Sequence, residues 1–361
     1  MDQVVDEAVR ALEQAFEKRD FSVVAPYATP DFVLDWSQSI GPLRGTYQGI
    51  DAARRMFENW AEAFSEMRRT TRHTRRFGHR VLVSATIEAR GAGSGVEATA
   101  GTSAAEIWTL DGDRIARIEL VPSVDDAWRS VRLARLAESR VYFVCEAKPR
   151  GEDPRPLLDA ALRGGADIVQ LRDPDLGDDE LVEAAGPFRD AAAAHGGLFV
   201  VNDRPDLVEP CGADGVHVGQ DDAPVAEARR IAGPAALIGL STHSAAQVDA
   251  AEAADAEARP DQISVGPVWE TPTKPGRPAA GLELLGHASR HATIPWFAIG
   301  GIDLENVSEV VASGAERLVV VRAIRDADDP EATARTLRNA LPATYPIATG
   351  REAEEAIGRG V

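Results

Sequence analysis

The chain has 361 residues, enough for two domains, and 44% of them are hydrophobic, too many for a disordered chain. Aspartate and glutamate number 58 against 39 lysines and arginines, which gives a formal net charge of −19. Nucleic-acid binders usually carry a basic stripe and membrane-surface proteins a basic helix, so this composition argues against both classes.

Nothing in the sequence indicates export or membrane insertion. No apolar run approaches the roughly 18–20 residues that span a bilayer, and the N-terminus MDQVVDEAVR lacks the apolar core of a signal peptide. Cys145 and Cys211 are too few and too far apart for a disulfide framework or a zinc site, and each is expected to be an inert buried residue. We therefore expect a cytoplasmic protein.

Residues 1–122 have the pattern of an α+β domain. Helical apolar spacing begins at residue 5, a strand is expected at 32–36, and a second amphipathic helix covers 50–64. Alternating apolar residues then predict strands at 81–85, 107–110 and 115–120. Helices followed by a meander of strands predict a cone-like domain, in which a curved sheet wraps the helices.

A connecting helix is expected at 123–139, and residues 140–342 then alternate short apolar strands with Ala-rich helices. The strands are expected at 141–144, 167–171, 198–202, 215–218, 237–240, 262–265, 296–299 and 318–321. This rhythm predicts a closed (β/α)₈ TIM barrel, with a doubly wound open sheet as the alternative. The tail at 343–361 has little apolar periodicity.

Polar, charged or glycine residues follow seven of these strands, at the end where TIM barrels carry their chemistry. Asp203 and Asp222 follow neighbouring strands, where two carboxylates can share a hard cation such as Mg²⁺. The other residues suit a phosphate or diphosphate, either as cations and hydroxyls or as glycine backbone N–H groups. These are Arg172, Ser241, Thr271, Thr273, Lys274, Gly300 and Gly301.

Structural alternatives stand beside these interpretations. Asp203 and Asp222 could instead cap the helices that follow them, and the loop with Lys274 could be an ordinary Pro-rich surface loop. His217 and His243 are either hydrogen-bonded structural residues or part of the site lining.

Three further features receive no catalytic role. The glycine-rich stretch 91–96 is interpreted as a hairpin turn, because no helix follows it. The basic run 67–76 is expected to be a solvated strand face, with an anion or partner surface as the alternative. Trp269 and Trp296 are expected to be packing residues, and no base–substrate geometry can be inferred for Asp35 and Trp36.

Six strings make the second region resemble the thiamine-phosphate synthase family. They are QLRD at 170–173, VNDR at 201–204, DGVHVGQDD at 214–222, LSTH at 240–243, GPVWETPTKPG at 266–276 and AIGGI at 298–302. The resemblance implies that hydroxymethylpyrimidine diphosphate is joined to hydroxyethylthiazole phosphate with release of diphosphate. It also implies an early break of the carbon–oxygen bond, giving a pyrimidine cation that the thiazole nitrogen captures.

The same resemblance implies a set of site residues. Asp203 and Asp222 would bind Mg²⁺, and Arg172, Ser241 and Lys274 would be catalytic. The pyrimidine diphosphate would be held by Gln170, Arg172, Asn202, Ser241 and Lys274. The thiazole phosphate side would be formed by Thr271, Thr273, Gly301, Val321 and Arg322.

The chain departs from the family pattern at two of these positions. Pro174 stands where the family usually has a lysine, which removes one charge-assisted contact to the diphosphate. Arg322 stands where many relatives have serine, and an arginine there can bind a phosphate bidentately. Two alternatives therefore remain for the barrel: a TenI-like thiazole tautomerase, and a barrel that has become a ligand-binding module.

The first region resembles the SnoaL-like, nuclear-transport-factor-like superfamily, through DWSQSIGPLRGTYQG at 35–49 and AAEIWTLDGDRIARIE at 104–119. This likeness concerns the fold and carries little functional information. It leaves two expectations for the domain: a small-ligand pocket, or a surface through which the chain forms a homo-oligomer.

Overall fold

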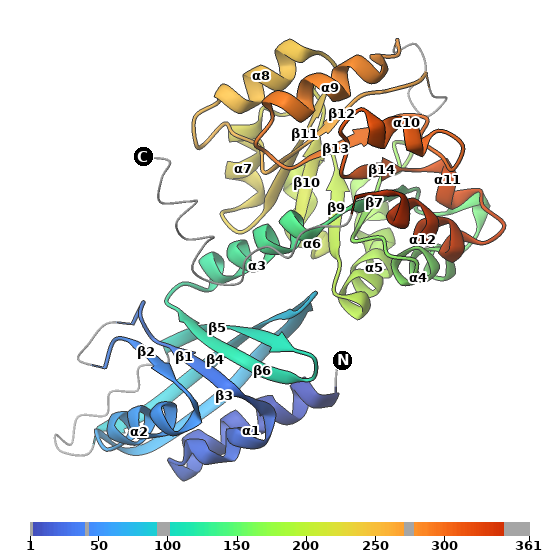
Figure 1. The fold of residues 1–361 in the computed structure, drawn as a ribbon. Coiled ribbons are helices and arrows are strands. Elements are labelled where there is room, and N and C mark those ends of the chain that lie inside the picture. The colour runs from blue at the N-terminus through green and yellow to red at the C-terminus, as the bar shows by residue number, and fades with distance from the viewer. Residues whose placement is uncertain (1–2, 40–42, 92–101, 271–277, 343–361) are drawn as a thin grey trace.

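Two domains follow one another along the chain (Figure 1). The computed structural model describes residues 3–39, 43–91, 102–270 and 278–342. A six-stranded sheet with two helices comes first, and a closed eight-stranded barrel follows. The predicted fold class, an α+β cone followed by a TIM barrel, is confirmed, and closure of the barrel excludes the open-sheet alternative. None of the helices in the described ranges is both long and apolar enough to cross a membrane.

The N-terminal domain wraps a curved sheet around α1 (Gln3–Lys18) and α2 (Ile50–Ala61). Its strand order is β2-β1-β6-β5-β4-β3, antiparallel except for the parallel pair β1 and β6. The strands are β1 (Ala28–Asp35), β2 (Thr46–Gln48), β3 (Phe64–Phe77), β4 (Arg80–Gly91), β5 (Thr102–Asp111) and β6 (Arg114–Val121). The short helix η1 (Phe21–Tyr27) precedes β1.

Two details of this domain differ from the sequence-based expectation. The second helix ends at Ala61, whereas Phe64 begins β3. Phe64 and Trp60 nevertheless meet edge to face, with ring centroids 5.2 Å apart. The apolar spacing of these two residues therefore reflects packing in the same core, although they do not belong to the same helix. The basic run lies on β3, an edge strand, but it is not wholly the solvated face that was expected: Arg69 is buried against Glu106, and Arg75 pairs with Asp214 of the second domain. The stretch expected to form a turn at 91–96 lies almost wholly outside the described residues.

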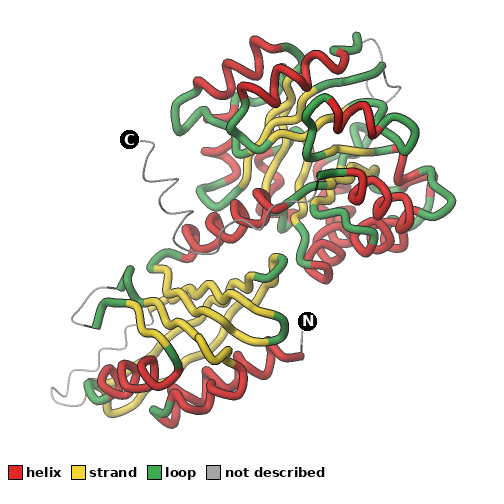
Figure 2. The backbone as a smooth tube through the Cα atoms, in the orientation of Figure 1, coloured by secondary structure: helices red, strands yellow, loops and turns green. Residues whose placement is uncertain are grey.

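Eight parallel strands form the barrel, and the helices surround it (Figure 2). The strands are β7 (Val141–Cys145), β8 (Ile168–Leu171), β9 (Leu198–Asn202), β10 (Gly215–Val218), β11 (Leu237–Thr242), β12 (Gln262–Val265), β13 (Trp296–Ile299) and β14 (Leu318–Val320). The main outer helices are α4 (Arg155–Arg163), α5 (Asp178–His195), α7 (Val225–Ala232), α8 (Ala245–Ala253), α9 (Gly281–His291) and α12 (Pro330–Ala340). Shorter helical segments are η2 (Pro149–Gly151), η3 (Pro205–Leu207), α6 (Val208–Cys211), α10 (Val307–Ala312) and α11 (Arg322–Arg325).

Helix α3 (Val124–Glu138) lies between the first sheet and the barrel (Figure 1). Ser123 caps its N-terminus by accepting a hydrogen bond from the Asp126 N–H. Val131 is fully buried in one apolar cluster with Leu82 and Ile107 of the sheet and Tyr142 and Phe297 of the barrel interior. The outer face of the sheet is therefore packed against the barrel through α3, and it is partly covered within a single chain.

Arginines on α3 also pair with the N-terminal rim of the barrel. The helix presents an arginine every three residues, and each one meets an aspartate that directly precedes a barrel strand. The pairs are Arg129–Asp261 at 2.5 Å, Arg132–Asp214 at 2.9 Å and Arg135–Asp167 at 2.8 Å. The N-terminal domain is thus attached at the rim opposite to the C-terminal strand ends.

The two cysteines are buried free thiols, as expected of inert core residues. Burial raises the pKa of the Cys145 thiol to about 12, and the pKa of Cys211 is also raised by burial. Neither is a thiolate at neutral pH, so neither has the reactivity of a nucleophile.

Candidate active site

A cavity of about 340 Å³ opens at the C-terminal ends of the barrel strands. It is within the size range of small-molecule sites. The cavity brings together seven of the residues proposed from the sequence, which come from β8, β9 and β11 and from the loops after β8, β13 and β14. They are Gln170, Arg172, Asn202, Ser241, Gly301, Val321 and Arg322, and Gly300, also proposed from the sequence, lines the cavity with them.

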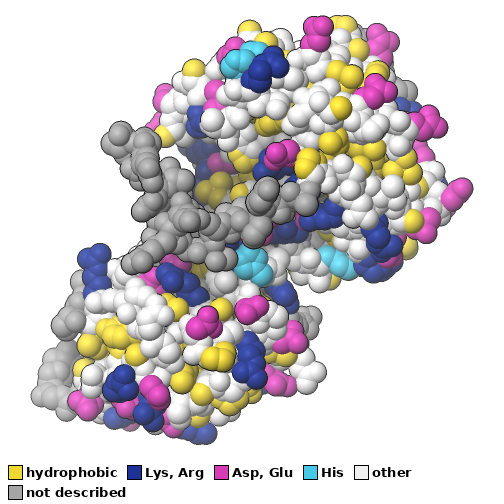
Figure 3. Space-filling view, in the orientation of Figure 1, with side chains coloured by type: hydrophobic (Ala, Val, Ile, Leu, Met, Phe, Trp, Pro, Cys, Tyr) yellow, Lys and Arg dark blue, Asp and Glu magenta, His cyan; other side chains and the backbone are white. Residues whose placement is uncertain are grey.

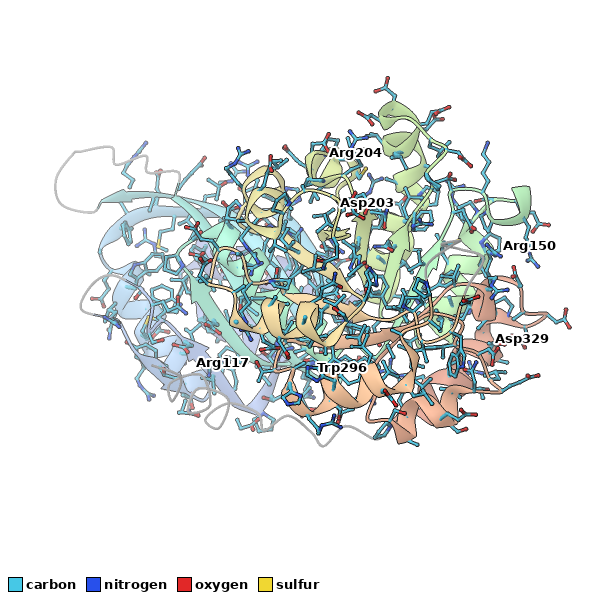
Figure 4. The ribbon with its side chains drawn as sticks, turned by 90° about the horizontal axis from the view of Figure 1, so that it is seen from above. Arg117, Arg150, Asp203, Arg204, Trp296 and Asp329 are labelled. Atoms are coloured by element: carbon cyan, nitrogen blue, oxygen red, sulfur yellow. The ribbon has the colours of Figure 1, made fainter. Side chains whose placement is uncertain are left out.

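A second cavity, of about 280 Å³, adjoins the first on the side of β8 and β9. Arg172 and Asn202 line both cavities, and Asp203 and Pro174 line the second. Figure 4 shows Asp203 beside Arg204, after β9. Arg172 is held in place through its backbone N–H, which donates to the Cys145 carbonyl at 2.9 Å. Because Arg172 lines both cavities, it stands at the junction of two spaces that could hold two parts of one substrate.

Asp203 adopts a backbone conformation that side chains rarely take. Its φ is +59°, in the left-handed region, where strain often marks a functional position. The Asp203 N–H donates to the His217 carbonyl at 2.9 Å, and the Asn202 amide donates to the Asp203 carboxylate at 2.5 Å. These contacts fix the carboxylate at the end of β9.

Asp222 lies in the turn after β10 and is exposed. Its carboxylate accepts a 2.7 Å hydrogen bond from the Gly219 N–H, and it lines neither of the two cavities. Because β9 and β10 are parallel neighbours, Asp203 and Asp222 follow strands at the same edge of the barrel. In the described part of the chain, no group of three or more His, Cys, Asp or Glu side chains has the arrangement of a metal site.

The cavity wall includes a buried polar layer that sequence reasoning only partly identified. His217 and Ser241 are 3.0 Å apart from Nε2 to Oγ, and both line the cavity together with Ser264. His217 is therefore both hydrogen-bonded and part of the cavity lining, so the two roles considered for it from the sequence are both present. Ser264 and Tyr142 were missed, because an inward-facing residue within a strand gives no signal beyond its alternation.

Tyr142 contributes an unpaired polar atom to this cavity. Its hydroxyl is buried and has no hydrogen-bond partner among the described residues, and its ring meets Phe297 edge to face. Burial raises the pKa of the Tyr142 hydroxyl, so it stays protonated. A buried phenol without a partner is costly, and a ligand acceptor would satisfy it.

Gly300 and Gly301 form the loop after β13 with φ values of +106° and +71°. A Cβ on Gly300 would lie 2.5 Å from Pro267, and one on Gly301 would lie 3.0 Å from Trp269. The Asn306 amide donates to the Gly301 carbonyl at 2.8 Å. The loop is therefore built for glycine, and it can bring backbone close to a ligand without side-chain interference.

The arginines after β14 are in different situations. Arg325 is bound to Glu146 at 2.5 Å and to Asp326 at 2.7 Å, and these carboxylates raise its pKa. Arg322 lines the cavity and is exposed. Of the two, Arg322 is placed to meet a ligand, whereas Arg325 is held by protein carboxylates.

Other residues singled out in the sequence have structural contacts. Trp296 is buried, and Trp269 packs beside Gly301. His243 lines the cavity and contacts the Gly266 carbonyl through Nδ1 at 2.6 Å. In the other domain, Asp35 is paired with Arg117. Thr271, Thr273 and Lys274 lie outside the described residues.

The visible surface of the molecule carries charges of both signs. On the face seen in Figure 3, acidic and basic side chains are interspersed over both domains, and no basic stripe crosses that face.

Comparisons with known proteins assign both regions. Residues 141–324 match the family model described as thiamine monophosphate synthase, and residues 9–118 match the model described as a SnoaL-like domain. The chain is 49% identical over 230 residues to a thiamine-phosphate synthase of Arthrobacter sp. (strain FB24), covering 58% of this chain and 97% of the relative. It is 50% identical over 208 residues to a thiamine-phosphate synthase of Streptomyces avermitilis, and this match covers 57% of this chain and 95% of the relative.

A solved structure agrees with these matches. The thiamine phosphate pyrophosphorylase from Pyrococcus furiosus is 29% identical, with a TM-score of 0.51, and the match covers 57% of this chain and 96% of that one. In each case the matched portion is about the size of the barrel and covers nearly the whole relative, so the N-terminal domain is additional to what these relatives contain. The chain therefore belongs to the thiamine monophosphate synthase family, and its transferase barrel is joined to an N-terminal SnoaL-like domain.

Proposed function

We propose that the barrel joins hydroxymethylpyrimidine diphosphate to hydroxyethylthiazole phosphate and releases diphosphate. The observation that carries this proposal is the position of Arg172 and Asn202 at the junction of two cavities. The larger cavity suits the two rings, and the smaller one, beside Asp203, suits the diphosphate. The bond that breaks would then lie close to Arg172.

The reaction needs little covalent help from the protein. The carbon–oxygen bond between the pyrimidine methylene and the diphosphate breaks, and its electron pair leaves with the diphosphate. The lone pair of the thiazole nitrogen then forms the new bond to the methylene carbon. Because negative charge grows on the leaving group, fixed cationic and hydrogen-bond donors there lower the barrier most. Arg172, which lines both cavities, is one donor that we assign to this point, and Lys274 is the second.

Asp203 and Asp222 are the residues that we assign to Mg²⁺. Their carboxylate oxygens, at the ends of neighbouring strands, are the donor type that this hard cation prefers, and Asp203 is already fixed by Asn202. The ion would neutralise the diphosphate as it departs. The chain's own part is to hold Asp203 at the wall of the smaller cavity and Asp222 in the turn after the neighbouring strand.

The opposite side of the larger cavity suits the thiazole phosphate. Gly301 offers its backbone N–H, and Arg322 follows β14, in the loop region where TIM barrels commonly bind phosphate. Thr271, Thr273 and Val321 complete this side in our assignment. Both substrates are multiply charged and do not cross membranes unaided, so we place the reaction in the cytoplasm.

Product formation tests the proposed function directly. We expect the full-length protein with both phosphorylated precursors and Mg²⁺ to form thiamine phosphate, and EDTA to abolish it until Mg²⁺ is added back. A parallel incubation with the thiazole tautomer alone separates this activity from that of a tautomerase. Precursor binding without any turnover would instead support a ligand-binding module.

The proline in the second cavity allows a gain-of-function prediction. Pro174 is exposed and lines the cavity beside Arg172. A lysine there adds a charge-assisted contact to the diphosphate, so we expect Pro174→Lys to raise kcat/KM by about tenfold. Steady-state kinetics on Pro174→Ala provides the control, because alanine removes the ring stiffness without adding charge. Equal gains in both variants would assign the effect to the backbone.

A further inference from the structure

Gln262 is a buried polar residue that lies below the cavity and does not line it. It is the first residue of β12 and faces the barrel interior, because its neighbour Ile263 belongs to the outer apolar core. Its amide Nε2 lies 2.9 Å from Nδ1 of His217 on β10. Its Oε1 has no hydrogen-bond partner among the described residues, so the contact to His217 is what orients the amide.

This contact spans three strands, and the middle strand is built to permit it. Strand register places His217, Gly239 and Gln262 at one level of β10, β11 and β12. A Cβ on Gly239 would lie 2.1 Å from the Gln262 amide nitrogen and 2.5 Å from the His217 Nδ1. Any side chain at Gly239 would therefore push the two groups apart, whereas glycine lets them meet inside the barrel.

The hydrogen bond has a consequence for the proton on His217. An amide N–H can only donate, so Nδ1 of a neutral imidazole accepts, and the proton is carried on Nε2. The Nε2–H then faces the hydroxyl oxygens of Ser241 at 3.0 Å and Ser264 at 3.3 Å. A serine oxygen that accepts from His217 keeps its own hydrogen free to donate elsewhere.

We propose that Gln262 is a positioning residue that fixes the Nε2–H tautomer of His217, so that Ser241 donates its hydroxyl hydrogen into the cavity. The ligand group this suits is a hydrogen-bond acceptor, such as a ring nitrogen of a pyrimidine. The inference rests on the proposed function only for the identity of that ligand. Gln262 acts through His217 and touches no substrate.

The tautomer is measured on substrate-free protein, independently of any activity. Nitrogen NMR of full-length protein labelled with ¹⁵N-histidine distinguishes protonated from unprotonated ring nitrogens, and the His217→Asn variant identifies the His217 signals. We expect Nε2 to carry the proton in the wild type. In Gln262→Leu we expect the proton to be shared between the two nitrogens. A proton on Nδ1 in the wild type, or an unchanged tautomer in the variant, overturns the proposal.

Binding of the pyrimidine diphosphate alone, followed by calorimetry, tests the consequence. Gln262→Leu should weaken binding by roughly 2- to 10-fold, the effect of one neutral hydrogen bond. Thr242→Val is the matched control, since Thr242 is fully buried and donates to the Ser264 carbonyl at 3.0 Å, between β11 and β12. Equal weakening in both variants would reduce Gln262 to a packing role. Absence of binding by the wild type would contradict the proposed function and leave the tautomer result standing.

Discussion

Asp222→Asn is expected to lower kcat/KM for thiamine phosphate formation by about 100- to 1,000-fold, the usual effect of removing one electrostatic stabiliser of a developing charge. Asparagine is nearly isosteric, and its amide oxygen can still accept the hydrogen bond from the Gly219 N–H, which is 2.7 Å long in the wild type. The turn should therefore persist while the negative charge is lost. Initial rates measured across a range of Mg²⁺ concentrations should also show a higher requirement for the metal.

The adjacent Asp221 supplies a matched control. It is exposed in the same turn, and its conversion to asparagine changes the net charge equally. We expect Asp221→Asn to keep the wild-type rate and Mg²⁺ dependence. Unchanged turnover in Asp222→Asn would leave the carboxylate only its hydrogen bond to Gly219 in the turn, since Asp222 does not cap the helix that follows. Equal losses in both variants would point to net charge and not to a metal ligand.

The barrel was predictable from the sequence because the pattern that marks each strand involves only residues that are close together in the sequence. Each strand is a short apolar run, and polar residues follow it in the sequence, so both the strand and its functional end can be recognised without a structure. Gln170, Arg172, Asn202 and Ser241 were found in this way, and the structure brings them to one cavity. The motif resemblance supplied their roles, which periodicity alone does not give.

The residues that were missed depend on pairing between strands. No sequence motif singles out Gln262. Only the strand register, which places it level with His217 and Gly239, shows that it belongs to the buried polar layer of the barrel interior. Tyr142 alternates like any core aromatic residue, and only the cavity shows its hydroxyl to be unpaired. Such relationships are long-range, so no local pattern carries them.

The connection between the domains was beyond sequence reasoning for the same reason. A helix at 123–139 was expected, but its apolar spacing did not indicate that its arginines pair with aspartates at the N-terminal rim of the barrel. Asp214 shows what was hidden: it is fully buried at the foot of β10 and binds Arg132 of α3 together with Arg75 of β3. Its carboxylate also accepts the Phe199 N–H at 2.9 Å. One side chain therefore joins the sheet, the helix and two barrel strands.

Asp214→Asn is accordingly expected to destabilise the whole chain by about 3–5 kcal/mol at neutral pH, because two guanidinium groups lose their shared buried carboxylate. Burial by itself raises the pKa of Asp214, but Arg75, Arg132 and the hydrogen bonds outweigh it and hold the pKa below its usual range. The free energy of unfolding, measured by urea denaturation, should show the loss. Asp153→Asn, at an exposed ion pair, should remain near the wild type.

The dependence of this loss on pH identifies its cause. A carboxyl whose pKa is lower in the folded state stabilises the fold fully above its unfolded pKa of about 3.9, and this contribution disappears as the pH falls through the folded value. The difference between wild type and Asp214→Asn should therefore be constant at neutral pH and should narrow below about pH 4. Asparagine does not titrate, so a gap that stays constant down to the acid-unfolding range would assign the destabilisation to altered packing. A narrowing gap would show that the SnoaL-like domain is held on the barrel by charge.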